Sequence, residues 1–399
     1  MRQSLRELPL AAVVWYLAGT LLLLVAINLA VLSANTHDGK DSQGKSVLNL
    51  LGRLDGEFYR RILEYGYDYS RTQSSSAPFF PGYPGMAKAL HDCGIPARWA
   101  LLAVSWSALL GALVMAQRYL RYRLPRDDQR ATASLALAAL ALNPMTFYMR
   151  FMYSESLFLL LLILLLDLLQ RRAQPLAVAV VCGALTGVRV PGVVIIPVVL
   201  LYAWNYSPAP RARAIHLALS LAVCGWGIAL FVWHLHADFG DALAFVYAQE
   251  AYERHGHSLF DKLSSMATLG PLRRMFDPAS IGYWNARHTG SLWVFSTQVG
   301  DAFFWALFAV LIAWGGWKRW LSREELLISA LLFAFGTWFQ ADRSDMACQG
   351  RYTSVIFPAY IVTGRLLAAI RWEIRLALAI AAAGMYIHYA VVFALGHSY

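Results

Sequence analysis

Long apolar runs separated by short clusters of charged residues give this chain its pattern. Runs such as 10–32 and 157–166 are rich in Leu and Ala and are apolar on nearly every face. A helix needs roughly 17–25 mostly apolar residues to cross a bilayer, whereas a strand of a membrane barrel shows about ten residues of alternating polarity. The pattern therefore predicts an all-α polytopic membrane protein. We place about eleven transmembrane helices at 8–32, 97–117, 131–148, 155–169, 174–188, 190–205, 214–235, 299–316, 324–340, 353–370 and 374–395.

The first apolar run could also be compared with a signal peptide. It is longer than the apolar region of a signal peptide, and it lacks a convincing small-residue cleavage site. We therefore expect a permanent helix, and a single transmembrane domain over residues 1–399.

Two segments between the predicted helices are long and polar, at about 33–96 and 236–298. In the first, apolar residues recur at steps of three and four between charged ones, which is typical of an amphipathic helix. This helix is expected to begin after Ser46, to end at Gly66 and to lie in the membrane interface, with Asp55 beside its apolar stripe. The stripe consists of Val47, Leu51, Leu54, Phe58, Ile62 and Tyr65, and the charged residues between them are Arg53, Glu57, Arg60, Arg61 and Glu64.

An aromatic segment, 77–85, follows in the same region and contains Pro78, Pro81 and Pro84. Each proline restricts its own backbone and that of the preceding residue, so we expect a rigid loop and no ordinary helix. Two interpretations fit its aromatic side chains: a belt at the membrane interface, or a wall of a binding site.

The second polar segment is expected to be a folded polar loop. Its histidines have no spacing that indicates a metal site, and surface histidines account for them. The charged and histidine residues noted there are His255, His257, Asp261, Arg273, Arg274, Asp277, Arg287 and His288.

Few ionisable residues fall near the predicted membrane helices, and most of these lie near one set of helix ends. Glu155 opens the fourth helix, and Arg189 lies where Gly and Pro divide a long apolar stretch. A charged side chain at the centre of a bilayer costs about 2.5–3.5 kcal/mol on insertion scales, so such residues indicate function. Alternatively, Glu155 and Arg189 simply pair and hold two helix ends together. Arg343, Asp345, Arg351 and Tyr352 precede the tenth helix, and a group of arginines there suits a lipid phosphate.

Composition supports the membrane assignment, and charge gives an orientation. The chain is 58% hydrophobic and 15% charged, with a formal net charge of +10 and a mean hydropathy of +0.48. The basic residues gather in alternate gaps between the helices, which are expected to be cytoplasmic. This places the N-terminus inside and the C-terminus outside, with both long polar segments outside. The basic clusters are Arg2 and Arg6; Arg118, Arg121, Arg123, Arg126 and Arg130; Arg171 and Arg172; Arg211 and Arg213; Lys318, Arg319 and Arg323; and Arg371 and Arg375.

The four cysteines add little. Cys182 and Cys224 fall inside apolar runs, whereas Cys93 and Cys348 fall on the predicted outer side and could form a disulfide.

Several short motifs resemble, in order, those of the GPI mannosyltransferase II (PIG-V-like) family and its bacterial relatives. The most specific group opens with Leu54-Asp55-Gly56-Glu57-Phe58-Tyr59, and the weaker ones follow as far as residue 358. The family usually has Trp before the aspartate, where this chain has Leu54. The matching segments are 54–59, 64–67, 79–84, Asn143-Pro144 with Phe147, 153–158, Thr186 to Arg189 with Gly192, Gln249 with 252–254, and Arg351-Tyr352 with Phe357-Pro358.

The resemblance implies a GT-C type glycosyltransferase, built as a helical bundle with its active site on the outer or lumenal face. It implies a polyprenyl-phosphate-linked sugar, mannose in that family, as donor and a glycolipid or other glycan as acceptor. We expect no cofactor. The family's catalytic aspartate corresponds to Asp55. A bacterial inner membrane with a periplasmic site is expected, or an endoplasmic reticulum membrane with a lumenal site in a eukaryote.

The chemistry of such a transfer needs a base near the acceptor hydroxyl and positive charge near the departing phosphate. Asp55 is our candidate base, and Arg189 and Arg351 are candidates for the phosphate. A single base acting on one face predicts inversion at the anomeric carbon. The residues expected to contact substrate are Glu57, Tyr59, Phe80, Tyr83, Glu155, Arg189, Arg351 and Tyr352.

Two other classes remain open at this stage. A transporter or lipid flippase would place ionisable residues along a path through the bilayer and would repeat its broken helices, whereas only one broken pair is visible here. A structural or assembly subunit would explain the hydrophobicity but not the polar residues on the predicted outer side.

Overall fold

The computed structural model describes residues 9–37, 46–125, 129–252, 259–280, 283, 296–341 and 345–395. All regular elements within these ranges are helical. The longer helices are α1 (Leu10–His37), α5 (Ala97–Arg123), α6 (Gln129–Leu142), α7 (Glu155–Gln170), α8 (Pro175–Val188), α9 (Ile196–Tyr206), α10 (Pro210–Val223), α11 (Trp226–Phe239), α15 (Thr297–Trp317), α16 (Arg323–Phe339), α18 (Phe357–Ala368) and α19 (Trp372–Leu395). The shorter ones are α2 (Val47–Leu51), α3 (Asp55–Tyr65), α4 (Gly82–Asp92), α12 (Ala244–Tyr247), α13 (Leu259–Ala267), α14 (Gly270–Phe276), α17 (Gln349–Ser354) and the 3₁₀ helices η2 (Pro144–Arg150), η3 (Val190–Ile195) and η4 (Ala248–Tyr252).

Long apolar helices make this a multi-pass membrane protein. Among the described residues, five helical stretches are long and apolar enough to cross a bilayer, judged by length and composition. A sixth is added if α6 and η2, which meet at a bend of 74°, are taken as one span. A helix lies within each of the predicted spans, but the total of eleven crossings stays a prediction. The five stretches are Leu10–Ser33, Ala97–Arg123, Pro210–Phe239, Thr297–Trp317 and Trp372–Leu395.

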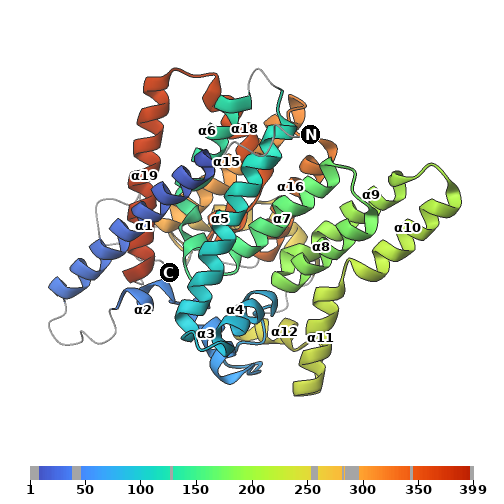
Figure 1. The fold of residues 1–399 in the computed structure, drawn as a ribbon. Helices are drawn as coiled ribbons and strands as arrows, with labels where there is room; N and C mark the ends of the chain where they lie inside the picture. Colours follow the sequence, from blue (N-terminus) through green and yellow to red (C-terminus); the bar gives the residue numbers. More distant parts are fainter. Residues whose placement is uncertain are drawn as a thin grey trace.

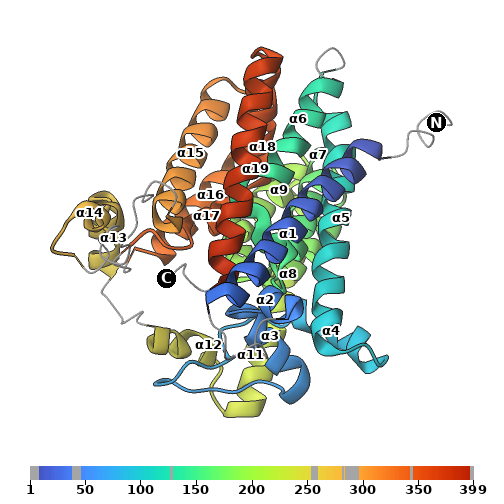
Figure 2. The ribbon, with the colours of Figure 1, turned by 90° about the vertical axis from the view of Figure 1, so that its left-hand side faces the viewer.

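The helices form one bundle with distinct ends. The short helices α2, α3, α4 and α12 gather at one end, and the turn between α18 and α19 lies at the other (Figures 1 and 2). Helix α5 packs against α7, α6 against α18, and α1 against α19. The packed interior is made of Leu, Ala, Phe and Tyr side chains from all of these helices, which are the residues expected where helix surfaces pack closely.

The third predicted span, 131–148, is not a single helix. Helix α6 ends at Leu142, because the Asn143 side chain accepts a hydrogen bond from the backbone N–H of Met145 at 2.8 Å and caps a new helix, η2. Pro144 then occupies the first position of η2, where its missing N–H costs nothing. The resulting bend carries residues 151–155 toward the end of the bundle that holds α2–α4.

The predicted amphipathic helix 47–65 is also wrong as one helix, although both predicted ends are found. Ser46 caps α2, and Gly66 ends α3 with a φ of 81°. The chain breaks at 52–54 because its backbone there bonds to a distant segment. The carbonyl of Leu51 accepts from the Met152 N–H at 3.0 Å, and the carbonyl of Arg53 accepts from the Tyr153 hydroxyl at 3.0 Å.

The aromatic segment 77–85 is a loop only in its first half, so the second half of that prediction is wrong. Helix α4 begins at Gly82 and includes Pro84, since a proline is tolerated in a first turn that needs no N–H donor. A Cβ atom at Gly82 would lie 2.8 Å from the carbonyl oxygen of Gly187. The glycine therefore permits the start of α4 to approach the end of α8.

The second polar segment is more helical than the predicted loop, since its described parts form α12, η4, α13 and α14. All four cysteines are free thiols, so the disulfide between Cys93 and Cys348 is not formed. Several residues considered above lie outside the described ranges: Arg2, Arg6, Arg126, Glu253, Arg254, His255, His257, Arg287, His288, Arg343 and the C-terminal residues 397–399.

Candidate active site

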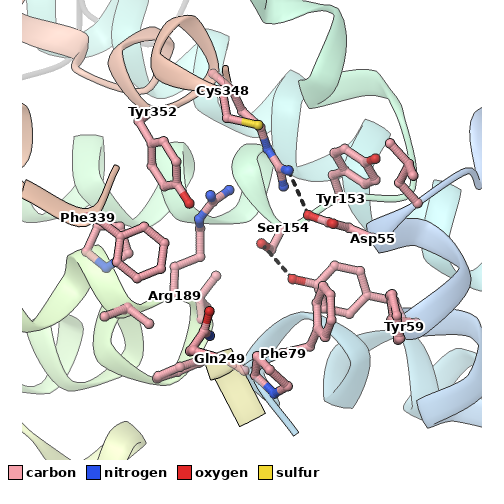
Figure 3. Close-up of a pocket in the computed structure, with 18 of the residues that line it drawn as sticks. Asp55, Tyr59, Phe79, Tyr153, Ser154, Arg189, Gln249, Phe339, Cys348 and Tyr352 are labelled. Carbon is pink, nitrogen blue, oxygen red and sulfur yellow. Dashed lines mark hydrogen bonds and ion pairs between the residues drawn. The ribbon is translucent and has the colours of Figure 1, made fainter. Parts of the chain in front are cut away.

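A cavity of about 440 Å³ opens among α3, the aromatic loop, the break between α8 and η3, and α17. We call it the Asp55 cavity; Figure 3 shows it with its labelled side chains. Because α3 supplies part of its lining, the cavity belongs to the end of the bundle where Figure 1 shows α2–α4. Its lining consists of Leu54, Asp55, Phe58, Tyr59, Pro78, Phe79, Phe80, Tyr153, Ser154, Val188, Arg189, Val190, Pro191, Gln249, Phe335, Phe339, Gln340, Cys348, Arg351, Tyr352 and Phe393.

Asp55 is the first residue of α3 and faces this cavity. Its carboxylate oxygen Oδ2 lies 2.7 Å from Nη1 of Arg351, and 30% of its side chain is exposed. The preceding residue, Leu54, has a φ of 53°, a backbone conformation that residues other than glycine rarely adopt. Such strain persists where surrounding contacts hold it, often at functional sites. The N-terminus of a helix also favours a negative charge, so the position suits an ionised carboxylate.

Arg351 joins the two acidic side chains of the site. Its guanidinium contacts Asp55 through Nη1 and Glu155 through Nε, and lies 4.5 Å from the centre of the Tyr153 ring. The backbone before it is anchored by Asp301, which accepts from the N–H groups of Cys348 at 2.9 Å and Gly350 at 2.7 Å. The backbone that carries Arg351 is therefore held in place, and its guanidinium has two anionic partners.

Glu155 lies beneath the cavity and binds both arginines. It is the first residue of α7 and is fully buried. Its Oε1 contacts Nε of Arg351 and Nη1 of Arg189. The structure thus contains the predicted Glu155–Arg189 pair, but with Arg351 added the contacts form a continuous chain from Asp55 to Arg189.

Arg189 is placed by the break between α8 and η3. It caps the end of α8 in an extended conformation, which directs its backbone away from the helix axis. Its guanidinium carbon lies 5.8 Å from the centre of the Tyr352 ring, and 11% of its side chain is exposed. Arg189 and Arg351 therefore line the cavity, and both contact the buried carboxylate of Glu155.

Tyr59 and Ser154 form the floor near Asp55. The Tyr59 hydroxyl donates to Ser154 Oγ at 3.0 Å, as the dashed line in Figure 3 marks. Burial raises the pKa of Tyr59 above its ordinary value, so its hydroxyl remains a donor at neutral pH. Tyr83 lies behind Tyr59, with ring centres 4.8 Å apart, and donates to the Leu101 carbonyl at 2.9 Å.

Aromatic side chains form the walls. Phe79 stacks on Phe58 with ring centres 4.8 Å apart, and Phe80 packs on Phe231 at 4.8 Å. On the facing side, Phe339 packs against Tyr352 at 5.8 Å. Flat apolar surfaces of this kind suit a sugar ring or an isoprenoid chain.

Glu57 does not line the cavity. Its carboxylate pairs with Arg60 and, at 3.3 Å, with Arg98 on α5. The hydrogen bond from Arg60 lowers the pKa of Glu57. Its contacts are those of a residue that holds α3 against α5.

The predicted base, Asp55, lines the cavity, and so do five of the eight residues predicted to contact substrate: Tyr59, Phe80, Arg189, Arg351 and Tyr352. Glu57, Tyr83 and Glu155 lie outside its lining, the last two behind it. Tyr153, Ser154, Phe79 and Gln249 belong to motifs that were noted, but they were not assigned to the site. Phe335, Phe339, Gln340, Cys348 and Phe393 were missed; the phenylalanines lie within apolar runs, where nothing in the local pattern separates a cavity wall from a lipid-facing residue.

Comparisons with known proteins leave the family open. No family model matches the chain, and no curated protein matches it. Solved structures of the oligosaccharyltransferase of Archaeoglobus fulgidus are similar to it at 12–13% identity, with TM-scores of 0.46–0.47. They include an apo form, a form tethered to an acceptor peptide with the NVT sequon, and a complex with an inhibitory peptide and a dolichol-phosphate. The alignments cover 96% of this chain and 55–56% of the oligosaccharyltransferase, so the chain spans little more than half the length of those structures.

Proposed function

We propose that this protein is a GT-C type membrane glycosyltransferase that moves a sugar from a polyprenyl-phosphate donor to a glycolipid or other glycan acceptor. The observation that carries the proposal is the chain of contacts Asp55–Arg351–Glu155–Arg189 beside one cavity. The order of the motifs that resemble the PIG-V-like family supports mannose as the sugar.

The reaction is a single displacement. The carboxylate of Asp55 accepts the proton of the acceptor hydroxyl as its oxygen bonds to the anomeric carbon. The bond from that carbon to the phosphate oxygen breaks, and its electron pair leaves with the polyprenyl phosphate. One displacement on one face inverts the configuration of the anomeric carbon.

The two arginines stabilise the departing phosphate. Both line the cavity, and a guanidinium presents several N–H donors in the geometry of phosphate oxygens. Because Glu155 already holds them in place, little reorganisation is needed when charge develops on the phosphate. Tyr59, Ser154 and Gln249 supply polar groups for sugar hydroxyls.

The proposed membrane orientation places the Asp55 cavity on the periplasmic face of a bacterial inner membrane, or on the lumenal face in a eukaryote, with the N-terminus cytoplasmic. The basic clusters at the opposite ends of the helices support it.

Incubation of the purified protein with radiolabelled polyprenyl-phosphate mannose and membrane glycolipids tests this proposal. We expect labelled glycolipid, with the configuration of the new glycosidic bond opposite to that of the donor. Polyprenyl-phosphate glucose in parallel tests the choice of sugar. If neither donor supports transfer while the protein is monodisperse and stable, the proposal is contradicted. Retention of configuration would contradict the single displacement.

A further inference from the structure

A second cavity, of about 630 Å³, lies at the other end of the bundle. It is bounded by the last turns of α7 and α9 and by the first turn of α16. We call it the basic cavity. Its volume falls within the range of about 300–1,000 Å³ that is typical of ligand pockets.

The basic cavity is separate from the Asp55 cavity, although α16 reaches both. Phe339 at the end of α16 lines the Asp55 cavity, and Arg323 at its start lines the basic cavity. Helix α16 has 17 residues, so a rise of 1.5 Å per residue separates its ends by about 24 Å. Helix α7 runs beside it, and its side chains from Leu157 to Leu169 are largely buried. Packed protein thus lies between the two cavities.

The lining of the basic cavity carries more positive than negative charge. Arg172 and Arg323 both line it, and within the described part of the chain neither guanidinium forms an ion pair. Glu324 is the one carboxylate of the lining. Two positive charges therefore face one negative charge, and the start of α16 adds the partial positive charge of a helix N-terminus.

The remaining lining is amphipathic. Leu201 and Leu327 contribute apolar surface, and Tyr202 and Asn205 contribute polar groups. The Tyr202 hydroxyl donates to the Ala173 carbonyl at 2.5 Å, and the Asn205 amide donates to the Leu201 carbonyl at 2.8 Å. Among the lining residues, the two arginines are the cationic donors for an anion.

We propose that the basic cavity binds the phosphate headgroup of an anionic phospholipid. Two arginines that form no ion pair with any described residue lie beside apolar walls, which matches a ligand that has both a phosphate and a hydrocarbon portion. Basic pockets between membrane helices bind anionic headgroups by this chemistry. A free phosphate would make no favourable contact with the apolar wall. The proposal does not depend on the glycosyltransferase reaction.

Native mass spectrometry of the full chain with phosphatidylglycerol or phosphatidylcholine measures this binding. The wild-type protein is expected to prefer phosphatidylglycerol. Arg172→Gln with Arg323→Gln should weaken that binding on the order of ten- to thirty-fold. The matched control is Arg118→Gln with Arg211→Gln, which removes the same charge from exposed residues outside the lining and should change the affinity by less than about twofold.

Two further variants test the site while keeping both arginines. Glu324→Gln removes the opposing charge and should tighten binding of phosphatidylglycerol, whereas Asn205→Trp fills the cavity and should weaken it. These variants decide the question if the double arginine variant does not fold. Equal losses in the double variant and its control would overturn the proposal, as would displacement of the lipid by an equal concentration of inorganic phosphate.

Discussion

Two fully buried glutamates, Glu155 and Glu325, stand at opposite ends of the bundle and make similar pairs with arginine. Each lies in the first turn of a long helix, where a negative charge is favoured. Glu325 uses both of its oxygens: it accepts from the Tyr119 hydroxyl, from Arg123 and from the backbone N–H of Ser322.

Glu155 is less completely bonded. Both of its arginines contact the same oxygen, Oε1, and the other oxygen is buried with no hydrogen-bond partner among the described residues. Arg189 and Arg351 also face a cavity, whereas Arg123 donates to the Trp320 carbonyl and closes a contact between helices. A buried ion pair therefore indicates a functional site only when its cation also lines a cavity that can hold a ligand.

Among the residues around Glu155 and Glu325, replacement of Arg351 is expected to lower the rate of sugar transfer most. Arg351→Gln removes the charge that joins Asp55 to Glu155, so the transfer rate should fall by about 10²–10³-fold. Arg351→Lys keeps the charge but loses the fork of donors and should recover part of the rate. Initial rates with saturating donor measure both variants. A rate within threefold of wild type in Arg351→Gln would show that the guanidinium takes no part in transfer.

Removal of each glutamate's charge separates stability from activity. Glu155→Gln leaves Arg189, and Glu325→Gln leaves Arg123, largely buried and without a carboxylate partner, so each should destabilise the protein by about 3–5 kcal/mol. Only Glu155→Gln should also lower kcat, because only its arginines face the Asp55 cavity.

Thermal unfolding in detergent, together with kcat and KM at a temperature where both variants are folded, checks this split. The comparison breaks down if Glu325→Gln loses kcat as strongly as Glu155→Gln does.

The helices were predictable from the sequence because hydrophobicity is a local property of each run, and a helix lies in each predicted span. The breaks were not predictable, because they depend on distant contacts. The predicted helix is interrupted at 52–54, since the carbonyls of Leu51 and Arg53 accept hydrogen bonds from residues 152 and 153, about 100 residues later. The polar half of the site was visible because Arg189 interrupts an apolar stretch, and because Asp55 and Arg351 fall in motifs that resemble those of the PIG-V-like family. The wall formed by α16 was not visible, since Phe335 and Phe339 lie in an apolar run like any other.

Replacement of Glu57, which is partly exposed, is expected to change stability less than replacement of either buried glutamate. Its pKa is lowered by the hydrogen bond from Arg60, so its stabilisation is present above the pKa of the unfolded chain and is lost as the pH falls through the lower, folded value. Glu57→Gln should destabilise the protein by less than about 1 kcal/mol at pH 7. The difference in Tm from wild type should shrink as the pH is lowered toward 3. A difference that does not change with pH would show that the carboxylate charge does not contribute.

The most direct test of the central claim is the single-turnover rate of sugar transfer in Asp55→Asn, with Glu64→Gln as its control. Both variants remove one negative charge from α3, but Glu64 lies outside the cavity and pairs with Arg60. With Asp55 as the base, Asp55→Asn should transfer sugar about 10²–10⁴-fold more slowly than wild type, while donor binding persists and Glu64→Gln keeps the wild-type rate. An Asp55→Asn protein that transfers sugar at the wild-type rate would contradict the account.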